Sequence, residues 1–144
     1  MSTLPELRTS SAEETEAAGE RLGRTLRPGD LLLLAGELGA GKTTFVRGLA
    51  RGLGVEGQVQ SPTFQLVRMH AGEVPLAHVD LYRVGTAAEL DDLGLEEILE
   101  EGVVAIEWGS RVIRPPGRWG RLDIEPLGAE SRLLRLEGPP EWVL

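Results

Sequence analysis

The chain has 144 residues, a formal net charge of -8 and no cysteine. This length suits one domain over residues 1–144 with a single core, and the lack of cysteine excludes disulfide bonds and thiolate metal sites. The negative charge argues against broad binding to a nucleic acid backbone, which needs clustered lysine or arginine. The acidic, polar N-terminus and the short apolar run at 31–35 indicate neither a signal peptide nor a membrane span, so we expect a cytoplasmic protein.

The first third of the chain predicts a helix, a strand and a second helix. Residues 11–26 begin with Ser11 and Glu14 in capping-box spacing and continue with apolar residues at helical spacing. The run DLLLLAG at 30–36 is apolar almost throughout, which is typical of a strand buried on both faces. Residues 43–53 again show helical spacing and are followed by Gly54, so a second helix is expected to end there.

The rest of the chain predicts more strands and one interrupted helix. We expect a hairpin around HAGE at 70–73, a helix over 86–101 that Gly94 breaks, and a loop at 114–120. The expected strands are short apolar or alternating runs between turn residues: 63–69, 74–82, 102–108, 121–127 and 131–138. This order of elements predicts an α/β fold, a single domain with a mixed β-sheet flanked by helices. Together with the phosphate-binding motif described next, it predicts a fold of the P-loop NTPase type.

A phosphate-binding motif stands between the first predicted strand and the second predicted helix. GELGAGKT at 36–43 fits G-x-x-x-x-G-K-[ST] in full. In such a loop the backbone N–H groups turn toward phosphate oxygens, and the next helix points its positive end at the same anion. The residues expected to contact the nucleotide are continuous in sequence: Glu37, Leu38, Gly39, Ala40, Gly41, Lys42, Thr43 and Thr44.

Lys42 is the only lysine among 15 lysine and arginine residues. A compact ammonium group can reach between the β- and γ-phosphates, where a wide, planar guanidinium fits badly. We therefore expect Lys42 to be catalytic, and we expect its side chain to be exposed in the loop. A single lysine at this position also excludes the Asn/Thr-Lys-x-Asp motif that reads guanine, so a guanine-reading GTPase is not expected.

Three oxygen-bearing side chains are candidates for holding Mg²⁺. The hydroxyl of Thr43 follows the lysine, and two apolar strands end in the carboxylates of Asp80 and Glu107. Because the carboxyl ends of strands in an open α/β sheet face the ligand crevice, either acid is a candidate to hold the cation directly or through water and to act in catalysis. The alternative, an exposed acid at a strand end, stays open for both.

Two further features have both a functional and a structural interpretation. Ser61 and Thr63 flank a proline in SPTF, where their hydroxyls could sense the γ-phosphate as switch loops do, or where the proline forms an ordinary turn. From Val84 to Ser110 the chain has no basic residue and eight acidic ones, which predicts a solvated helical face or a surface for a basic partner. His78 is expected to be a strand residue rather than a metal ligand, because the chain has only two histidines.

GELGAGKTTF, SPTF, HVDLYR and EW, in this order, resemble the bacterial TsaE (YjeE) family over about residues 10–125. The resemblance implies a small P-loop ATPase, slow without its partners, that supports N6-threonylcarbamoyladenosine formation at position 37 of tRNA. It implies a TsaD-like threonylcarbamoyl-transferase and a TsaB-like companion subunit as partners, with tRNA contacted only indirectly and no membrane involved. It also implies that Trp108 lies beside the nucleotide and that Asp80 and Glu107 are acids of the Mg²⁺ site.

The match departs from many relatives at Gly109 and Ser110, where a proline and an acid are usual. Two other functions also fit a P-loop in a chain of this size. One is a small-molecule kinase, for which Arg114, Arg118 and Arg121 would form an arginine lid. The other is a binding module that ATP switches without being hydrolysed.

Overall fold

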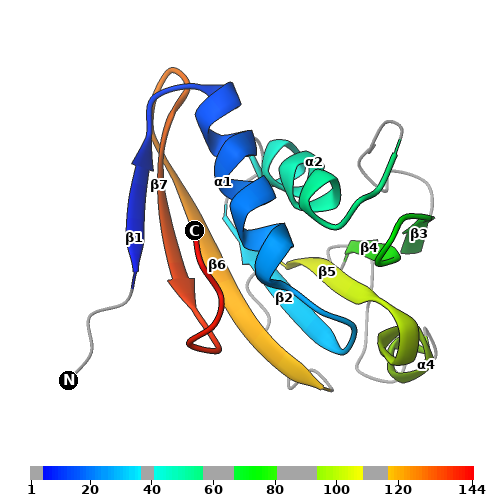
Figure 1. The fold of residues 1–144 in the computed structure, drawn as a ribbon. Coiled ribbons are helices and arrows are strands. Elements are labelled where there is room, and N and C mark those ends of the chain that lie inside the picture. The colour runs from blue at the N-terminus through cyan, green and yellow to red at the C-terminus, as the bar shows by residue number, and fades with distance from the viewer. Residues whose placement is uncertain (1–4, 37–40, 57–66, 81–93, 109–116) are drawn as a thin grey trace.

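The computed structural model describes residues 5–36, 41–56, 67–80, 94–108 and 117–144. Seven strands form one mixed sheet in the order β1-β7-β6-β2-β5-β4-β3 (Figure 1). The strands are β1 (Glu6–Thr9), β2 (Asp30–Ala35), β3 (Val67–His70), β4 (Leu76–Asp80), β5 (Val103–Trp108), β6 (Arg118–Gly128) and β7 (Ser131–Glu137). The helices are α1 (Ala12–Thr25), α2 (Lys42–Gly52) and α4 (Leu95–Glu101). None of the helices in these ranges is long and apolar enough to cross a membrane.

The centre of the sheet is parallel and buried on both faces. β2 pairs in parallel with β5 and β6, and β5 pairs in parallel with β4, whereas β1, β7 and β3 add antiparallel pairs at the edges. Along β2, Leu32 and Leu34 join the core beneath α1 and α2, and Leu31 and Leu33 join the core that includes α4. The expected mixed α/β sheet, with β2 buried on both sides, is confirmed.

Helices α1 and α2 pack side by side against one face of the sheet (Figure 1). Each helix presents a pair of glycines four residues apart to the other, Gly19 and Gly23 on α1 and Gly48 and Gly52 on α2. A Cβ built at any of the four would overlap the backbone of the opposite helix. Small residues let two helix backbones approach this closely, so the helix that follows the phosphate loop is fixed against α1.

Two short segments differ from what the sequence predicts. β1 has no sequence counterpart among the predicted strands, because Leu7 is its only apolar residue. The expected loop at 114–120 is wrong for its last three residues, since β6 begins at Arg118.

The guanidinium of Arg118 donates from Nε to Oδ1 of Asp30 at 2.7 Å and from Nη2 to Oδ2 at 3.2 Å. Asp30 is 1% exposed, so this ion pair fixes the start of β6 beside the start of β2.

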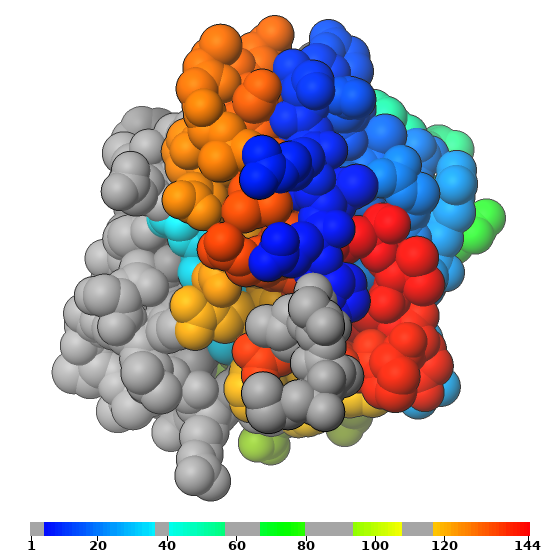
Figure 2. Space-filling model, turned by 90° about the vertical axis from the view of Figure 1, so that its left-hand side faces the viewer, coloured from blue at the N-terminus to red at the C-terminus, as the bar shows by residue number. Residues whose placement is uncertain are grey.

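The C-terminal segment packs back onto the domain. Trp142 is 4% exposed, and its ring lies against Gly120 and Gly138, where a Cβ would collide with it. The backbone N–H of Val143 donates to the hydroxyl of Thr25 at 3.4 Å. Figure 2 shows these last residues, in red, lying against the N-terminal part of the chain, in blue.

Candidate nucleotide-binding site

The start of α2 is arranged for an anion. Gly41 precedes the helix with a φ of 102°, a left-handed conformation that glycine adopts without strain. Gly41 has no side chain to cap this end of α2, and the amide groups in the first turn of a helix have no partner within the helix and can bind an anion. Residues 37–40, which include four of the predicted nucleotide contacts (Glu37, Leu38, Gly39 and Ala40), lie outside the described residues.

Lys42 is buried rather than exposed, which corrects the expectation for this side chain. It is 5% exposed, and its Nζ donates to the carbonyl oxygen of Gly36 at 3.0 Å. The ammonium group thus bridges the end of β2 and the start of α2, the two elements that the loop connects. Thr43 and Thr44 are half-buried in the first turn of the same helix.

Asp80 is the last residue of β4, and Glu107 is the next-to-last residue of the neighbouring strand β5. Asp80 on β4 pairs with Glu107 on β5, and Glu107 pairs with Leu34 on β2, two residues before Gly36. Both acids therefore lie at the C-terminal end of the parallel strands, where the phosphate loop leaves β2. The side chain of Glu107 is 10% exposed. The side chains of Asp80 and Trp108 lie outside the description.

The contact between His78 and Glu107, near the C-terminal ends of β4 and β5, was not predicted. His78 on β4 is fully buried, and its Nε2 lies 2.8 Å from Oε2 of Glu107. Despite this distance, neither ring nitrogen makes a well-directed hydrogen bond within the described part of the chain. His78 is a strand residue, as expected. Its contact with Glu107 depends on β4 and β5 being neighbours, and the sequence alone gave no such signal.

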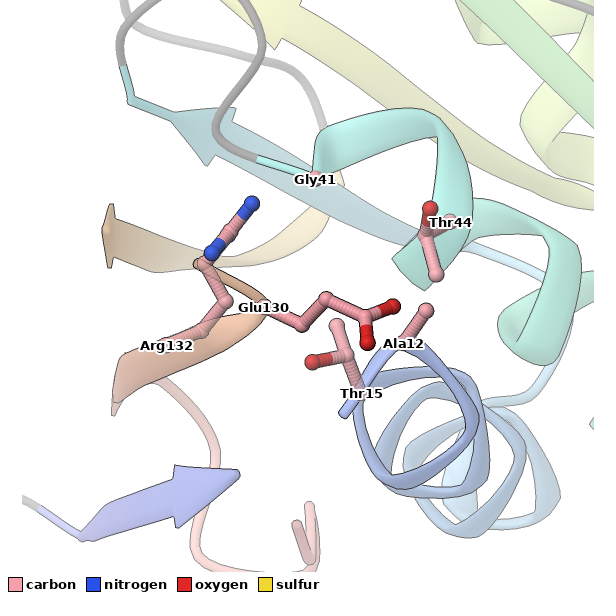
Figure 3. Close-up of a pocket in the computed structure, with 6 residues that line it drawn as sticks. All are labelled: Ala12, Thr15, Gly41, Thr44, Glu130 and Arg132. Carbon is pink, nitrogen blue, oxygen red and sulfur yellow. The ribbon is translucent and has the colours of Figure 1, made fainter. Parts of the chain in front are cut away.

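A hollow of about 80 Å³ opens beside the start of α2. Its lining comes from three parts of the chain: Ala12 and Thr15 of α1, Gly41 and Thr44 at the start of α2, and Glu130 and Arg132 of the β6–β7 hairpin. Figure 3 shows the carboxylate of Glu130 reaching toward α1 and the guanidinium of Arg132 directed toward Gly41. Sequence reasoning missed Thr15, Glu130 and Arg132, because no local motif joins these three segments.

The arginine of the hollow is held by its own hairpin. Nη1 of Arg132 donates to the carbonyl oxygens of Ala129 and Ser131 at 2.9 and 2.8 Å. A Cβ at Gly41 would stand 3.5 Å from Nε of Arg132. The hollow therefore combines the guanidinium of Arg132 and the carboxylate of Glu130 with the first turns of two helices, and this lining favours a polar ligand.

Comparison with known proteins identifies the family. Residues 9–132 match the family described as threonylcarbamoyl adenosine biosynthesis protein TsaE. The chain belongs to the TsaE family. The match includes Lys42, Glu107 and all six residues that line the hollow, whereas the C-terminal residues around Trp142 lie beyond it.

Individual relatives carry the same family name. A tRNA threonylcarbamoyladenosine biosynthesis protein TsaE from Streptomyces coelicolor is 53% identical over 95 residues, which cover 63% of this chain and 64% of the relative. Its namesake from Treponema pallidum is 44% identical over 103 residues, 71% of this chain and 76% of the relative. The chain thus spans just under two thirds of the first relative. The crystal structure of YdiB from Bacillus subtilis superposes with a TM-score of 0.78 at 32% identity, covering 99% of this chain and 90% of that one.

The arginines of the alternative kinase function make other contacts or lie outside the described residues. Arg118 is held at the opposite end of β2 by Asp30, which contradicts a role for this residue in an arginine lid. Nε of Arg121 donates to Oδ1 of Asp123 within β6 at 3.0 Å. Ser61, Thr63 and Arg114 lie outside the described residues.

The acidic segment of the chain is described only in part. The four glutamates of α4 are exposed, and they are Glu96, Glu97, Glu100 and Glu101. The carbonyl of Gly102, which ends α4, accepts from the N–H of Gly29 at 3.0 Å. Because Gly29 precedes β2, these charges lie at the end of the sheet opposite to the phosphate loop.

Proposed function

We propose that this TsaE-family chain binds ATP with Mg²⁺ at the start of α2, hydrolyses it, and thereby supports the formation of N6-threonylcarbamoyladenosine in tRNA. The observation that carries the proposal is the position of Lys42. Its buried ammonium group lies between the end of β2 and the first turn of α2, 3.0 Å from the carbonyl of Gly36. A lone lysine placed there neutralises phosphate charge while the helix amides supply hydrogen bonds.

We propose an orientation of ATP that the geometry of α2 supports. Successive residues of a helix are turned by about 100°, so Lys42 and Thr44 face different sides of its first turn. Lys42 faces Gly36 and β2, whereas Thr44 faces the hollow. The β- and γ-phosphates accordingly lie on the lysine side, toward Glu107, and the nucleoside extends into the hollow beside Arg132.

The residues near the phosphates suit a hard cation. Mg²⁺ takes oxygen ligands and is commonly held by one or two carboxylates together with substrate phosphates. Thr43 offers a hydroxyl, Glu107 offers a carboxylate that is 10% exposed, and Asp80 ends the adjacent strand. Bound there, Mg²⁺ would polarise the phosphates and neutralise charge that develops during hydrolysis. Thr43, Asp80 and Glu107 are therefore the proposed residues of the cation site.

Support for the role in tRNA modification comes from the family and from its named relatives. We infer that the partners are a TsaD-like transferase and a TsaB-like subunit. The net charge of -8 disfavours direct capture of tRNA, since phosphate contacts supply much of such affinity. In this arrangement the chain acts on tRNA only through its protein partners.

Two assays test the proposal. Phosphate release from ATP is measured for the purified chain without any acceptor, and modified adenosine is then measured in tRNA incubated with the transferase pair, ATP and the chain. We expect slow phosphate release that Lys42→Ala abolishes, and modification that depends on the unsubstituted chain. Phosphate transfer only to an added small molecule would indicate a kinase. Bound ATP that stays intact, with modification still supported, would indicate a nucleotide-switched binding module.

A further inference from the structure

The buried imidazole of His78 is not accounted for by a nucleotide site built from Lys42, Thr43 and Glu107. A fully buried polar ring loses its contacts with water, and this loss is costly unless protein groups replace them. Neither nitrogen of His78 has a well-directed hydrogen bond within the described residues. Oε2 of Glu107 lies 2.8 Å from Nε2.

The strand register explains how this approach arises. His78 pairs with Ala105 across β4 and β5, and Glu107 follows Ala105 by two residues on the same face of β5. Leu76 and Ala105 belong to the core beneath α1 and α2, so His78 and Glu107 lie on the side of the sheet that carries α2 and Lys42.

We infer that His78 is a positioning residue that orients the carboxylate of Glu107 toward the cation of a bound ATP–Mg²⁺. This inference rests on the proposed function. Nε2 lies within hydrogen-bonding distance of Oε2, and hydrogen bonds at such sites often become well aligned only when the ligand is present. When Nε2 of His78 donates a hydrogen bond to Oε2 of Glu107, it holds that oxygen on the buried side, and Oε1 then faces the cation.

Loss of His78 should therefore weaken the binding of Mg²⁺ more than the binding of the nucleotide. Groups that hydrogen-bond a metal ligand fix its orientation, and their loss commonly weakens metal binding by about 10- to 100-fold. His78 is fully buried, whereas the side chain of Glu107 is 10% exposed, so His78 acts through that carboxylate and not by touching ATP. A residue that served only for packing would instead change the stability of the fold and leave the dependence on Mg²⁺ unchanged.

The test measures binding of a fluorescent ATP as Mg²⁺ is raised from an EDTA-treated start, and it also records urea unfolding of each variant. We expect His78→Leu to raise the Mg²⁺ concentration at half-maximal effect by about 10- to 100-fold and to leave binding without Mg²⁺ unchanged. His78→Gln, whose amide nitrogen can take the place of Nε2, should restore most of the Mg²⁺ response. His70→Leu is the matched control, because His70 is the other histidine and lies on β3. It should leave the Mg²⁺ response as it is in the unsubstituted chain.

A double substitution separates positioning from packing. If His78 acts through Glu107, His78→Leu should have no further effect on the Mg²⁺ response of Glu107→Gln, because the interaction it supports is already lost. If His78→Leu does not fold, His78→Asn replaces it, since the shorter amide cannot reach Glu107 as glutamine does.

The outcomes distinguish this inference from the proposed function. An unchanged Mg²⁺ response in His78→Leu, while Glu107→Gln weakens that response, would overturn the role of His78 and leave the nucleotide site intact. Additive effects in the double variant would overturn it in the same way. Absence of any Mg²⁺-dependent binding in the unsubstituted chain would instead reject the proposed function.

Discussion

Gly48 on α2 and Glu16 on α1 approach so closely that a Cβ on Gly48 would overlap the carbonyl oxygen of Glu16. Gly19 approaches Phe45 in the same manner from the other helix. This contact joins the helix that follows the phosphate loop to the helix that forms the far wall of the hollow. The position of Ala12 and Thr15 relative to Gly41 therefore depends on the glycine pairs.

The first prediction concerns this contact. Gly48→Ala should lower the free energy of unfolding by about 1–3 kcal/mol, because the helices must separate to admit the methyl group. Binding of ATP should weaken as well, since α1 moves relative to α2. Urea unfolding and ATP titration measure the two effects. Arg47→Ala, an exposed position on the same helix, should change unfolding by no more than about 0.5 kcal/mol.

The second prediction concerns the C-terminal segment. Trp142→Ala should lower the free energy of unfolding by about 3–5 kcal/mol, because it empties the space against Gly120 and Gly138. The neighbouring substitution Val143→Ala is the control, since Val143 is 53% exposed. Chemical unfolding followed by circular dichroism compares the two. Equal stability of both variants would mean that the segment does not contribute to the fold.

The third prediction concerns pH. Burial lowers the pKa of His70, and the nearby charges of His78 and Arg68 lower it further. Because the pKa in the unfolded chain is about 6.5, the unfolded state takes up the proton first as the pH falls. The stabilising contribution is thus fully present above about pH 6.5 and is lost as the pH falls through the lower folded-state pKa.

Unfolding measured at several pH values tests this assignment. His70→Gln should reduce the dependence of the unfolding free energy on pH below about 6.5, and the NMR titration of His70 should have its midpoint below 6.5. An NMR midpoint at or above that of a free histidine would contradict the assignment.

The fourth prediction concerns the hollow. Ala12→Phe fills it and should weaken ATP binding by about tenfold or more, equivalent to about 1.4 kcal/mol. Binding of inorganic tripolyphosphate should be unaffected, because only the nucleoside is proposed to enter the hollow. Ala12→Ser, which barely changes the volume, is the control. Equal loss of ATP and tripolyphosphate would place the nucleoside elsewhere.

Elements that carry a strong local pattern could be predicted from the sequence. The apolar runs that became β2 and β5 indicated buried strands, and Ser11 does cap α1, its hydroxyl accepting from the N–H of Glu14 at 3.1 Å. The phosphate motif placed Lys42 and Thr43 at the start of α2. The carboxylates of Asp80 and Glu107 could be placed at one end of the sheet, because parallel strands have their C-terminal ends on the same side.

Features that depend on strand order or on distant contacts could not be predicted. The glycines of α1 and α2 lower the helix propensity of these segments. Only the packing of α1 against α2 shows that they allow the two helix backbones to approach. The bridge from Arg118 to Asp30 joins residues 88 positions apart. The contact of His78 with Glu107 requires β4 and β5 to be adjacent. The burial of Lys42 could not be predicted either, because its partner is the backbone carbonyl of Gly36, which no side-chain pattern reveals.

The central claim is that Lys42 and the start of α2 bind the phosphates of ATP, and equilibrium titration of ATP–Mg²⁺ tests it most directly. A charge-assisted hydrogen bond contributes about 1.5–3 kcal/mol, so Lys42→Ala should weaken binding by about 10- to 100-fold. Urea unfolding must show that the variant is folded, and Arg47→Ala should bind as the unsubstituted chain does. Weakened binding in Lys42→Ala alone is the predicted result. Unchanged affinity in a folded Lys42→Ala would contradict the account.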